Sequence, residues 1–204
     1  MADAYLDARA DAYGHSLALI GPVARDLGVT GILVSSDADA STARGFGFSD
    51  VVTDRIPDGI PLLRDAAYGT APDTRAVMRL EAEVIAVKHV EAGAGVSYGY
   101  THRTSEPTTL ALIGLGYADG VPRLASNRAS VLLAGSQRPL VGRIAMDQLV
   151  LSCGSDEPTV GEHAILFGVA SDGCSTLGEW AAWTERDPLD IPAGLGHRIR
   201  REAS

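Results

Sequence analysis

Two tyrosines have side chains and neighbours suited to proton transfer. Tyr98 lies in the run VSYG and Tyr117 in the run GYADG, each beside a glycine. Because glycine has no Cβ, a ligand can approach the backbone closely at such positions. A phenol exchanges protons near neutral pH only when its pKa falls well below about 10, through a neighbouring cation. The residues alone leave two interpretations open: a proton-transfer tyrosine, or an aromatic side chain packed in a β-structure.

Other kinds of site find little support in the sequence. The β-rich part contains no Ser–His–Asp set and no P-loop, and the five histidines show no metal-ligand spacing, so we expect no metal site. The glycines of Gly45–Gly47 and Gly114–Gly116 are interpreted as turns rather than dinucleotide-binding loops. Cys153 and Cys174 are expected to be reduced, structural thiols. Asp119 by itself is interpreted as a turn carboxylate.

The composition is that of an ordinary globular protein. The chain has 204 residues, of which 46% are hydrophobic and 21% are charged, enough for one good core or two small ones. Its net charge of −9 repels phosphate backbones, so nucleic acid is not an expected partner. No stretch approaches the ~20 apolar residues that cross a bilayer, and no basic segment followed by an apolar run opens the chain. We therefore expect a cytoplasmic protein with no membrane association.

The first part of the chain alternates short apolar strands with helices. Strands are predicted over residues 4–8, 31–36 and 50–53, and this order predicts a parallel α/β layer. A Pro-Asp turn near residues 71–75 ends the region, so we predict domains at 1–75 and 76–204. One helix is predicted from Asp37 to Arg44. Another is predicted from Ser16, with an apolar face of Leu17, Ile20, Val23, Ala24 and Leu27.

From Met78 the hydrophobic period changes to two. In MRLEAEVIAVKHV one face carries Met78, Leu80, Ala82, Val84 and Ala86. A helix is predicted over 175–182, capped by Ser175 or Thr176 with Glu179 close behind. The expected fold class is α+β, a short parallel α/β segment followed by an antiparallel β-barrel or sandwich. Its further strands are predicted over residues 95–101, 108–115, 129–135, 137–144, 147–153 and 162–168.

Five motifs then occur in a specific order. They are VSYG at 96–99, GYADGVPR at 116–123, VGRIAMDQ at 141–148, VGE at 160–162 and LDIPAGLGHRIRR at 189–201. Together they resemble the C-terminal β-domain of bacterial alanine racemases, from about Met78 to Arg201. In front of them, ADAYGHS at 10–16 is similar to the segment that follows the family's cofactor lysine. AAYG at 66–69 resembles the segment that ends the last strand of the family's (β/α)₈ barrel.

The resemblance implies an isomerase that interconverts L- and D-alanine with pyridoxal 5'-phosphate (PLP), for D-alanine and peptidoglycan supply. The family holds PLP on a lysine of its barrel, and a tyrosine from the other subunit's β-domain acts as the opposite acid or base. Tyr98 matches that catalytic tyrosine. Tyr117 and Met146 match residues at the substrate's carboxylate end and its access channel. Tyr13 matches a tyrosine that hydrogen-bonds the cofactor's phosphate.

Three departures from the family pattern concern the cofactor. The lysine position is Arg9, and a guanidinium stays protonated and cannot form a Schiff base. Lys88 is the only lysine of the chain and lies on the first long β-strand. Leu189 stands where a phosphate-binding tyrosine is expected. The α/β segment is also far shorter than the ~250 residues of a complete barrel, so the resemblance implies a severely truncated barrel.

Three interpretations follow. In the first, the chain is a PLP-dependent racemase that is impaired as an isolated chain. In the second, it is a non-catalytic module that pairs with itself or with a full-length racemase and supplies Tyr98 in trans. In the third, it is a degenerate product without a function. The expected ligand is a small amino acid. One feature distinguishes the second interpretation from simple decay: the lysine is lost, whereas Tyr98, Tyr117 and Met146 are retained.

Overall fold

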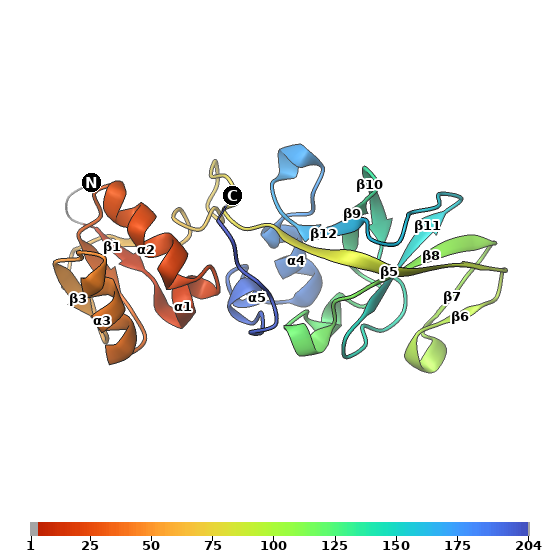
Figure 1. Cartoon of the computed structure of the whole chain (residues 1–204), viewed down its shortest axis with the longest axis horizontal. Helices are drawn as coiled ribbons and strands as arrows, with labels where there is room; N and C mark the ends of the chain where they lie inside the picture. Colours follow the sequence, from red (N-terminus) through yellow and green to blue (C-terminus); the bar gives the residue numbers. More distant parts are fainter. Residues whose placement is uncertain (1–3, 204) are drawn as a thin grey trace. The chain divides into compact units, whose positions relative to one another are not determined.

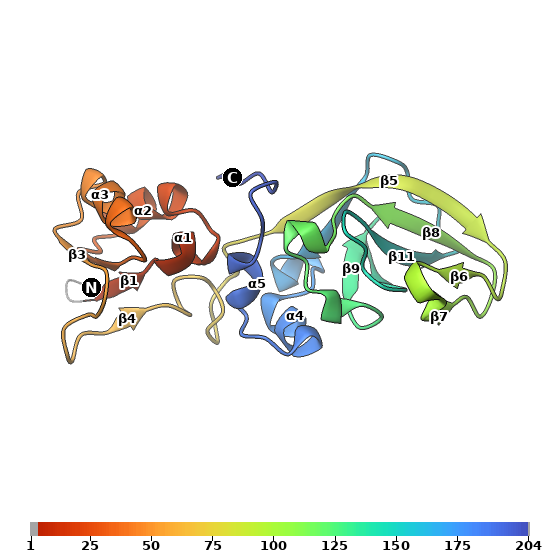
Figure 2. The same ribbon diagram turned by 90° about the horizontal axis from the view of Figure 1, so that it is seen from below.

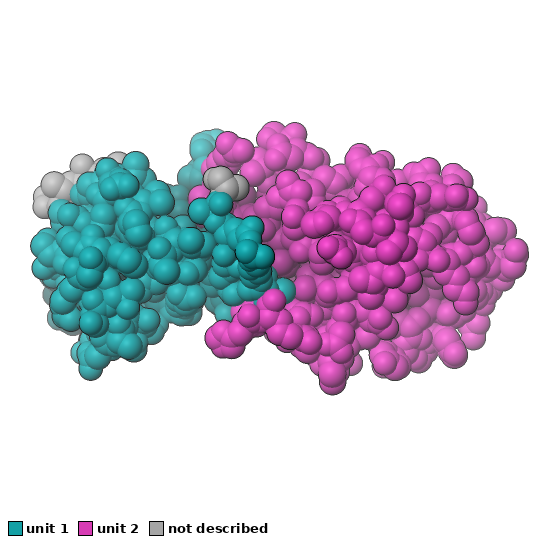
Figure 3. All heavy atoms as spheres, in the orientation of Figure 1, with its two compact units in different colours: residues 1–74, 192–194, 199–204 teal, residues 75–191, 195–198 magenta. Residues whose placement is uncertain are grey.

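The computed structural model of the chain describes residues 4–203. It divides into two compact units, which are described separately here (Figure 3). Unit 1 comprises residues 1–74, 192–194 and 199–204, and unit 2 comprises residues 75–191 and 195–198. The helix α5 (Asp190–Ala193) is divided, since Asp190 and Ile191 belong to unit 2 and Pro192 and Ala193 to unit 1.

Unit 1 is built on an open, parallel sheet, as predicted, and β4 adds a fourth strand that the sequence pattern did not predict. The strand order is β3-β2-β1-β4, so β4 pairs in parallel with β1 although α2, β2, α3 and β3 separate them in sequence. Helices α2 and α3 lie on the same face of this sheet (Figure 2). The α3 start agrees with the prediction, because the Ser36 hydroxyl accepts a hydrogen bond from the Asp39 N–H. The elements are β1 (Tyr5–Asp7), α2 (Leu17–Asp26), β2 (Gly31–Leu33), α3 (Asp37–Gly45), β3 (Asp50–Val52) and β4 (Leu62–Leu63).

The buried face of α2 differs from the predicted one. Val23 is 55% exposed and Leu27 is 67% exposed, so the predicted apolar face is wrong at these two positions. The helix packs instead through Gly21, where an added Cβ would lie 2.7 Å from the Phe46 ring. Ser16 precedes the helix as predicted, but its backbone φ is 68° and its side chain makes no capping hydrogen bond. The close contact between Gly21 and Phe46 therefore decides which face of α2 is buried.

Unit 2 is an antiparallel sheet of six strands in the order β10-β9-β12-β5-β8-β11 (Figure 1). A bridge between Leu140, just after β10, and Leu151 of β11 links the two edges, so the sheet nearly closes into a barrel. This agrees with the predicted β-domain. The strands are β5 (Leu80–Val90), β8 (Thr108–Ile113), β9 (Ser130–Leu133), β10 (Ser136–Pro139), β11 (Leu149–Gly154) and β12 (His163–Phe167), with a separate pair β6 (Gly95–Val96) and β7 (His102–Arg103).

Helix α4 (Leu177–Thr184) contributes to the core of unit 2. Of the two predicted caps, Thr176 is the one used, and it forms a reciprocal capping box with Glu179. Trp180 is 1% exposed, donates its indole N–H to the Leu166 carbonyl at 2.7 Å and packs edge-on against Phe167. A buried indole with a satisfied N–H fixes this helix on the barrel.

Three β-strand predictions fail locally. The β5 register shifts between Val84 and Ala86, so the alternation changes and Ala86 is exposed rather than inward. The strand predicted over 95–101 stops at Val96, because positive φ angles at Ser97 and Tyr100 force a turn. The strand predicted over 137–144 likewise stops at Pro139 and continues as a loop. The described residues 4–203 also contain four short 3₁₀ turns: η1 (Tyr98–Tyr100), η2 (Tyr117–Asp119), η3 (Arg123–Ala125) and η4 (Ala170–Asp172).

Within residues 4–203, no helix combines the length and the apolar character that a membrane span requires.

Candidate functional site

The three residues predicted to act on substrate lie on three loops of unit 2. Tyr98 begins the turn η1 between β6 and β7, and Tyr117 begins the turn η2 after β8. Met146 lies on the loop between β10 and β11. Their exposed fractions are 68% for Tyr98, 37% for Tyr117 and 54% for Met146. For side chains of this size, such exposure leaves the functional atoms open to another molecule.

The loop of residues 141–147, which carries Met146, is hydrogen-bonded to the loops that carry Tyr98 and Tyr117. The Ser97 hydroxyl donates to the Arg143 carbonyl at 2.6 Å, which fixes the turn of Tyr98 on this loop. The backbone N–H of Tyr117 donates to the Ala145 carbonyl at 3.0 Å. The structure therefore brings the three predicted residues onto one set of hydrogen-bonded loops.

Gly116 sets how closely two of these loops approach. A Cβ added there would lie 2.3 Å from the Met146 carbonyl oxygen, which no side chain can accept without moving the backbone. The neighbouring Ala118 N–H donates to that same carbonyl at 2.9 Å. A glycine predicted as a simple turn residue thus also permits the contact between the Tyr117 and Met146 loops.

Two guanidinium groups accompany the exposed tyrosines. An added Cβ at Gly99, next to Tyr98, would lie 3.6 Å from the Arg143 guanidinium. The Arg123 guanidinium lies over the Tyr117 ring, 5.1 Å from its centre. The loops are therefore locally cationic in a chain whose net charge is −9, which suits a ligand that carries a carboxylate.

Asp119 does more than close a turn. It is only 6% exposed, accepts the Gly116 N–H at 2.9 Å and forms an ion pair with Arg198 at 3.0 Å. Arg198 also contacts Asp147 at 2.9 Å. Hydrogen bonding to Asp147 and the charge of Asp119 raise the pKa of Arg198 further above its ordinary value. This charged bridge links the Tyr117 turn to the end of the Met146 loop.

Unit 1 holds Tyr13, which is expected to contact the cofactor's phosphate, and Arg9, which stands in place of the family's cofactor lysine. Arg9 donates to both carboxylate oxygens of Asp7, at 2.9 and 2.7 Å, and the Tyr13 hydroxyl donates to the same carboxylate at 2.8 Å. Asp7 is 0% exposed. Burial alone raises the pKa of Asp7, but the hydrogen bonds from Arg9 and Tyr13 outweigh burial and leave it below the ordinary value. Arg9 and Tyr13 are therefore both engaged by a carboxylate of the chain itself.

A left-handed turn presents this cluster at the end of β1. The residues from Ala10 to Tyr13, all non-glycine, have φ angles between 50° and 56°, a conformation that costs about 1–2 kcal/mol per residue. Hydrogen bonds offset this strain: the Asp11 carboxylate accepts the Leu17 N–H at 2.8 Å. The Tyr68 hydroxyl donates to the Asp7 carbonyl at 2.6 Å. The turn is held from several sides.

The remaining positions singled out in the sequence do not join either cluster. Leu189 is buried, and Lys88 lies on the exposed surface of β5 in unit 2. Cys153 and Cys174 are free and buried, and burial raises the pKa of both thiols. Among residues 4–203 there is no group of three or more His, Cys, Asp or Glu side chains that could hold a metal ion.

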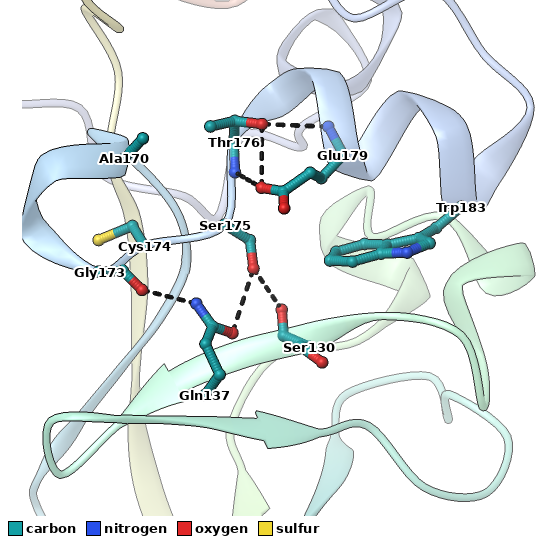
Figure 4. A pocket seen from close by; sticks show the side chains of 9 residues that line it. All are labelled: Ser130, Gln137, Ala170, Gly173, Cys174, Ser175, Thr176, Glu179 and Trp183. Atoms are coloured by element: carbon teal, nitrogen blue, oxygen red, sulfur yellow. Dashed lines mark hydrogen bonds between the residues drawn. The ribbon is translucent and has the colours of Figure 1, made fainter.

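A hollow of about 530 Å³ lies elsewhere on unit 2, beside α4 (Figure 4). Its polar groups bond one another: the Ser175 hydroxyl donates to the Ser130 carbonyl, and the Gln137 amide donates to the Gly173 carbonyl at 2.6 Å. The helix start is already capped by Glu179. None of the predicted site residues lines this hollow.

The comparison with protein families matches the C-terminal part of the chain. Residues 77–203, more than half of the chain, match the family described as alanine racemase, C-terminal domain. The chain belongs to this family. The alanine racemase family predicted from the five motifs is confirmed, and so is the fold class.

Relatives and solved structures agree with this assignment. The chain is 44% identical over 143 residues to an alanine racemase of Thermobifida fusca and 48% identical over 122 residues to one of Salinispora arenicola. These matches cover 67% and 57% of this chain but only 38% and 33% of the relatives, so the chain spans little more than a third of their length. An alanine racemase structure from Streptomyces lavendulae is 29% identical with a TM-score of 0.66, over 97% of this chain and 65% of that one. The structure from Bartonella henselae has a TM-score of 0.84 over 98% of this chain and 92% of that one, and at 18% identity it supports the fold alone.

Sequence inspection missed several charged residues of these clusters. Asp7 lies only two residues from Arg9, but β1 ends at Asp7 and Arg9 begins the following turn, so a strand pattern did not indicate their contact. Arg123 lies in the same quoted motif as Tyr117, and Arg143 lies in another motif, on a loop distant in sequence from the Tyr98 turn that it approaches. Arg198 pairs with carboxylates about 50 and 80 residues away, which no local pattern indicates.

Proposed function

We propose that this chain supplies one half of an alanine racemase site, the half that carries Tyr98, to a full-length racemase, and that it does not racemise alanine by itself. The contrast between Tyr98 and Arg9 carries this proposal. Tyr98 is exposed on a fully formed β-domain, whereas Arg9 stands at the lysine position and is bound to Asp7.

PLP does not fit the residues that unit 1 offers. The Bartonella henselae racemase is described with covalently bound pyridoxal phosphate, and a covalent link of that kind requires a primary amine. Arg9 offers none, and the Tyr13 hydroxyl already donates to Asp7. In unit 2, the side chain of Leu189, at the position where the resemblance implies a phosphate-binding tyrosine, has no polar atom. No catalytic step of this chain is therefore assigned to PLP, and the cofactor belongs to the partner racemase in this proposal.

The chain's own contribution is proton transfer and substrate placement. Tyr98 would give or take a proton at its phenol oxygen, opposite the base of the partner chain. The Arg143 guanidinium lies beside the turn that carries Tyr98 and adds positive charge there. Tyr117, with Arg123 over its ring, and Met146 would border the space for a small amino acid, with the cationic charge directed to its carboxylate.

The exposed aromatic and apolar side chains support docking onto a partner. Tyr98, Tyr100, Tyr117 and Met146 are all more than a third exposed, and large aromatic side chains of this kind dominate the binding energy of protein interfaces. A second copy of this chain would supply Arg9 and not a lysine. The partner of the active form is therefore a complete racemase, and pairing of two copies gives an inactive form.

The test is complementation of a racemase that lacks its own tyrosine. The Thermobifida fusca racemase, with phenylalanine at the position aligned with Tyr98, is co-expressed with this chain and purified through a tag on the chain. We expect a mixed complex on size-exclusion chromatography and alanine racemisation at least tenfold above that of either protein alone. A complex without added activity, or no complex, would contradict the proposal.

A further inference from the structure

We propose that the Asp7 carboxylate prevents an amine at position 9 from reacting with an aldehyde cofactor. This effect is independent of the arginine that occupies position 9. On this view, replacing Arg9 with lysine is not enough to create a reactive amine. The Asp7 carboxylate must be removed as well. The inference goes beyond the proposed function, because it concerns unit 1 and its own residues rather than Tyr98.

The geometry around Asp7 supports a fixed anion at this position. Its carboxylate receives the Arg9 guanidinium on both oxygens and the Tyr13 hydroxyl on one, and its side chain is 0% exposed. Asp7 is the last residue of β1, and the Tyr68 hydroxyl binds its carbonyl at 2.6 Å. The carboxylate therefore cannot swing into solvent without breaking several hydrogen bonds within unit 1.

Any cation at position 9 lies within reach of this anion. The Arg9 backbone N–H is itself 3.3 Å from the Asp7 carboxylate, so the two residues are held together at their backbones as well as through the guanidinium. A lysine side chain starting from that backbone would meet the same buried carboxylate. An ammonium group beside a buried carboxylate stays protonated, and a protonated amine does not attack an aldehyde.

Other charges near the turn do not take this role. Asp11 is exposed, and its carboxylate accepts the Leu17 N–H, on the other side of the left-handed turn. The Arg64 guanidinium lies over the Tyr13 ring at 5.4 Å and adds positive charge. Asp7 is thus the carboxylate that contacts position 9, and Asp11 offers a matched control of the same charge in the same segment.

The test measures how fast an amine at position 9 reacts with PLP. The amine nitrogen attacks the aldehyde carbon, water leaves, and a C=N bond forms; borohydride then delivers hydride to that carbon and fixes the label as a secondary amine. Lys88, exposed on β5 and the only lysine of the natural chain, serves as an internal reference. Peptide mass spectrometry gives the ratio of label at position 9 to label at Lys88.

Three full-length variants are compared: Arg9→Lys, Asp7→Asn/Arg9→Lys and Asp11→Asn/Arg9→Lys. We expect the ratio to rise at least about tenfold in the Asp7 double variant over Arg9→Lys alone, since one pKa unit changes the free amine tenfold. The Asp11 double variant is expected to match Arg9→Lys. Circular dichroism confirms folding, and Asp7→Ala/Arg9→Lys replaces the first double variant if the asparagine does not fold.

Equal ratios with and without Asp7, at whatever level, would overturn the inference. So would an equal increase with Asp11→Asn, because the effect would then be general electrostatics rather than the contact. Neither result would bear on complementation by Tyr98, which depends on unit 2. The two proposals can therefore fail separately.

Discussion

The two units present their polar residues in opposite ways. In unit 1, Arg9 and Tyr13 are bonded side chain to side chain with a buried carboxylate. In unit 2, Tyr98 and Met146 are exposed, and hydrogen bonds to the loop backbone position their turns. In unit 1 the polar side-chain atoms are occupied by hydrogen bonds within the chain, whereas in unit 2 they are accessible to a partner. Because backbone hydrogen bonds position the turns of unit 2, its side chains are free to take part in a site on another chain.

This comparison gives different expectations for substitution in each unit. Changing an exposed side chain in unit 2 should alter function and leave stability nearly unchanged. Changing a member of the Asp7 cluster should alter stability first. Both tryptophans, Trp180 and Trp183, lie in unit 2, so their fluorescence follows its unfolding selectively. Calorimetry follows both units.

The largest expected effect is that of Tyr98→Phe on the complemented racemase. Removing a general acid or base costs about 10²–10⁴-fold in rate, so the restored activity should fall at least about a hundredfold. Tyr100→Phe is the matched control, since Tyr100 lies in the same turn and is 62% exposed. Racemisation is measured by the change in optical rotation of L-alanine. Equal losses in both variants would remove the distinction between the two tyrosines.

The next effect concerns Arg9→Met, which leaves the Asp7 carboxylate buried without its cation. Breaking a buried ion pair from one side costs about 3–5 kcal/mol, and the partial exposure of Arg9 places the expected loss at about 2–3 kcal/mol. Calorimetry should show a lower transition for unit 1, and tryptophan fluorescence an unchanged one for unit 2. Arg44→Met, at an exposed position of α3, should change neither. A loss below about 1 kcal/mol would mean that Asp7 relaxes into solvent.

Gly116→Ala tests the backbone approach between the Tyr117 and Met146 loops. A Cβ 2.3 Å from the Met146 carbonyl forces the loops apart, and overpacking of this kind costs about 1–3 kcal/mol. Urea unfolding followed by tryptophan fluorescence should show the loss. Gly178→Ala in α4 is the control, because its Cβ would meet only the Thr176 hydroxyl at 3.7 Å and would favour the helix by up to about 1 kcal/mol. Equal stability of the two variants would show that the loops yield without cost.

Local patterns predicted much of the fold. Alternation indicated the β-strands of unit 2, and the Thr176–Glu179 spacing indicated the start of α4. Predictions failed where tertiary contacts decide: Gly21 against Phe46 rotates α2, and the register shift after Val84 exposes Ala86. A pattern of residue types cannot reveal a bulge or a close helix contact, because both depend on the neighbouring element.

The candidate site was predictable to a similar degree. The motifs identified Tyr98, Tyr117 and Met146, and the structure brings these onto hydrogen-bonded loops. The sequence also identified Arg9 as a departure from the family. It did not indicate that Asp7 binds Arg9, because a carboxylate in a predicted buried strand carries no sign of its partner. Pairings of that kind become visible only with coordinates.

The smallest expected effect is the pH dependence of unit 1. The pKa of Asp7 lies below its ordinary value in the folded chain, so its stabilising contribution is complete above about pH 4 and is lost as the pH falls through the depressed pKa. The unit 1 transition should therefore fall on acidification, and less so in Asp7→Asn. The fall should also be smaller in Arg9→Met, because the side-chain hydrogen bond and the charge of Arg9 both lower the pKa of Asp7 and are lost with the arginine. Calorimetry at about pH 7 and about pH 3 measures the change of the unit 1 transition in each protein. The same change in the unsubstituted chain and in Arg9→Met would show that Arg9 does not control the charge of Asp7.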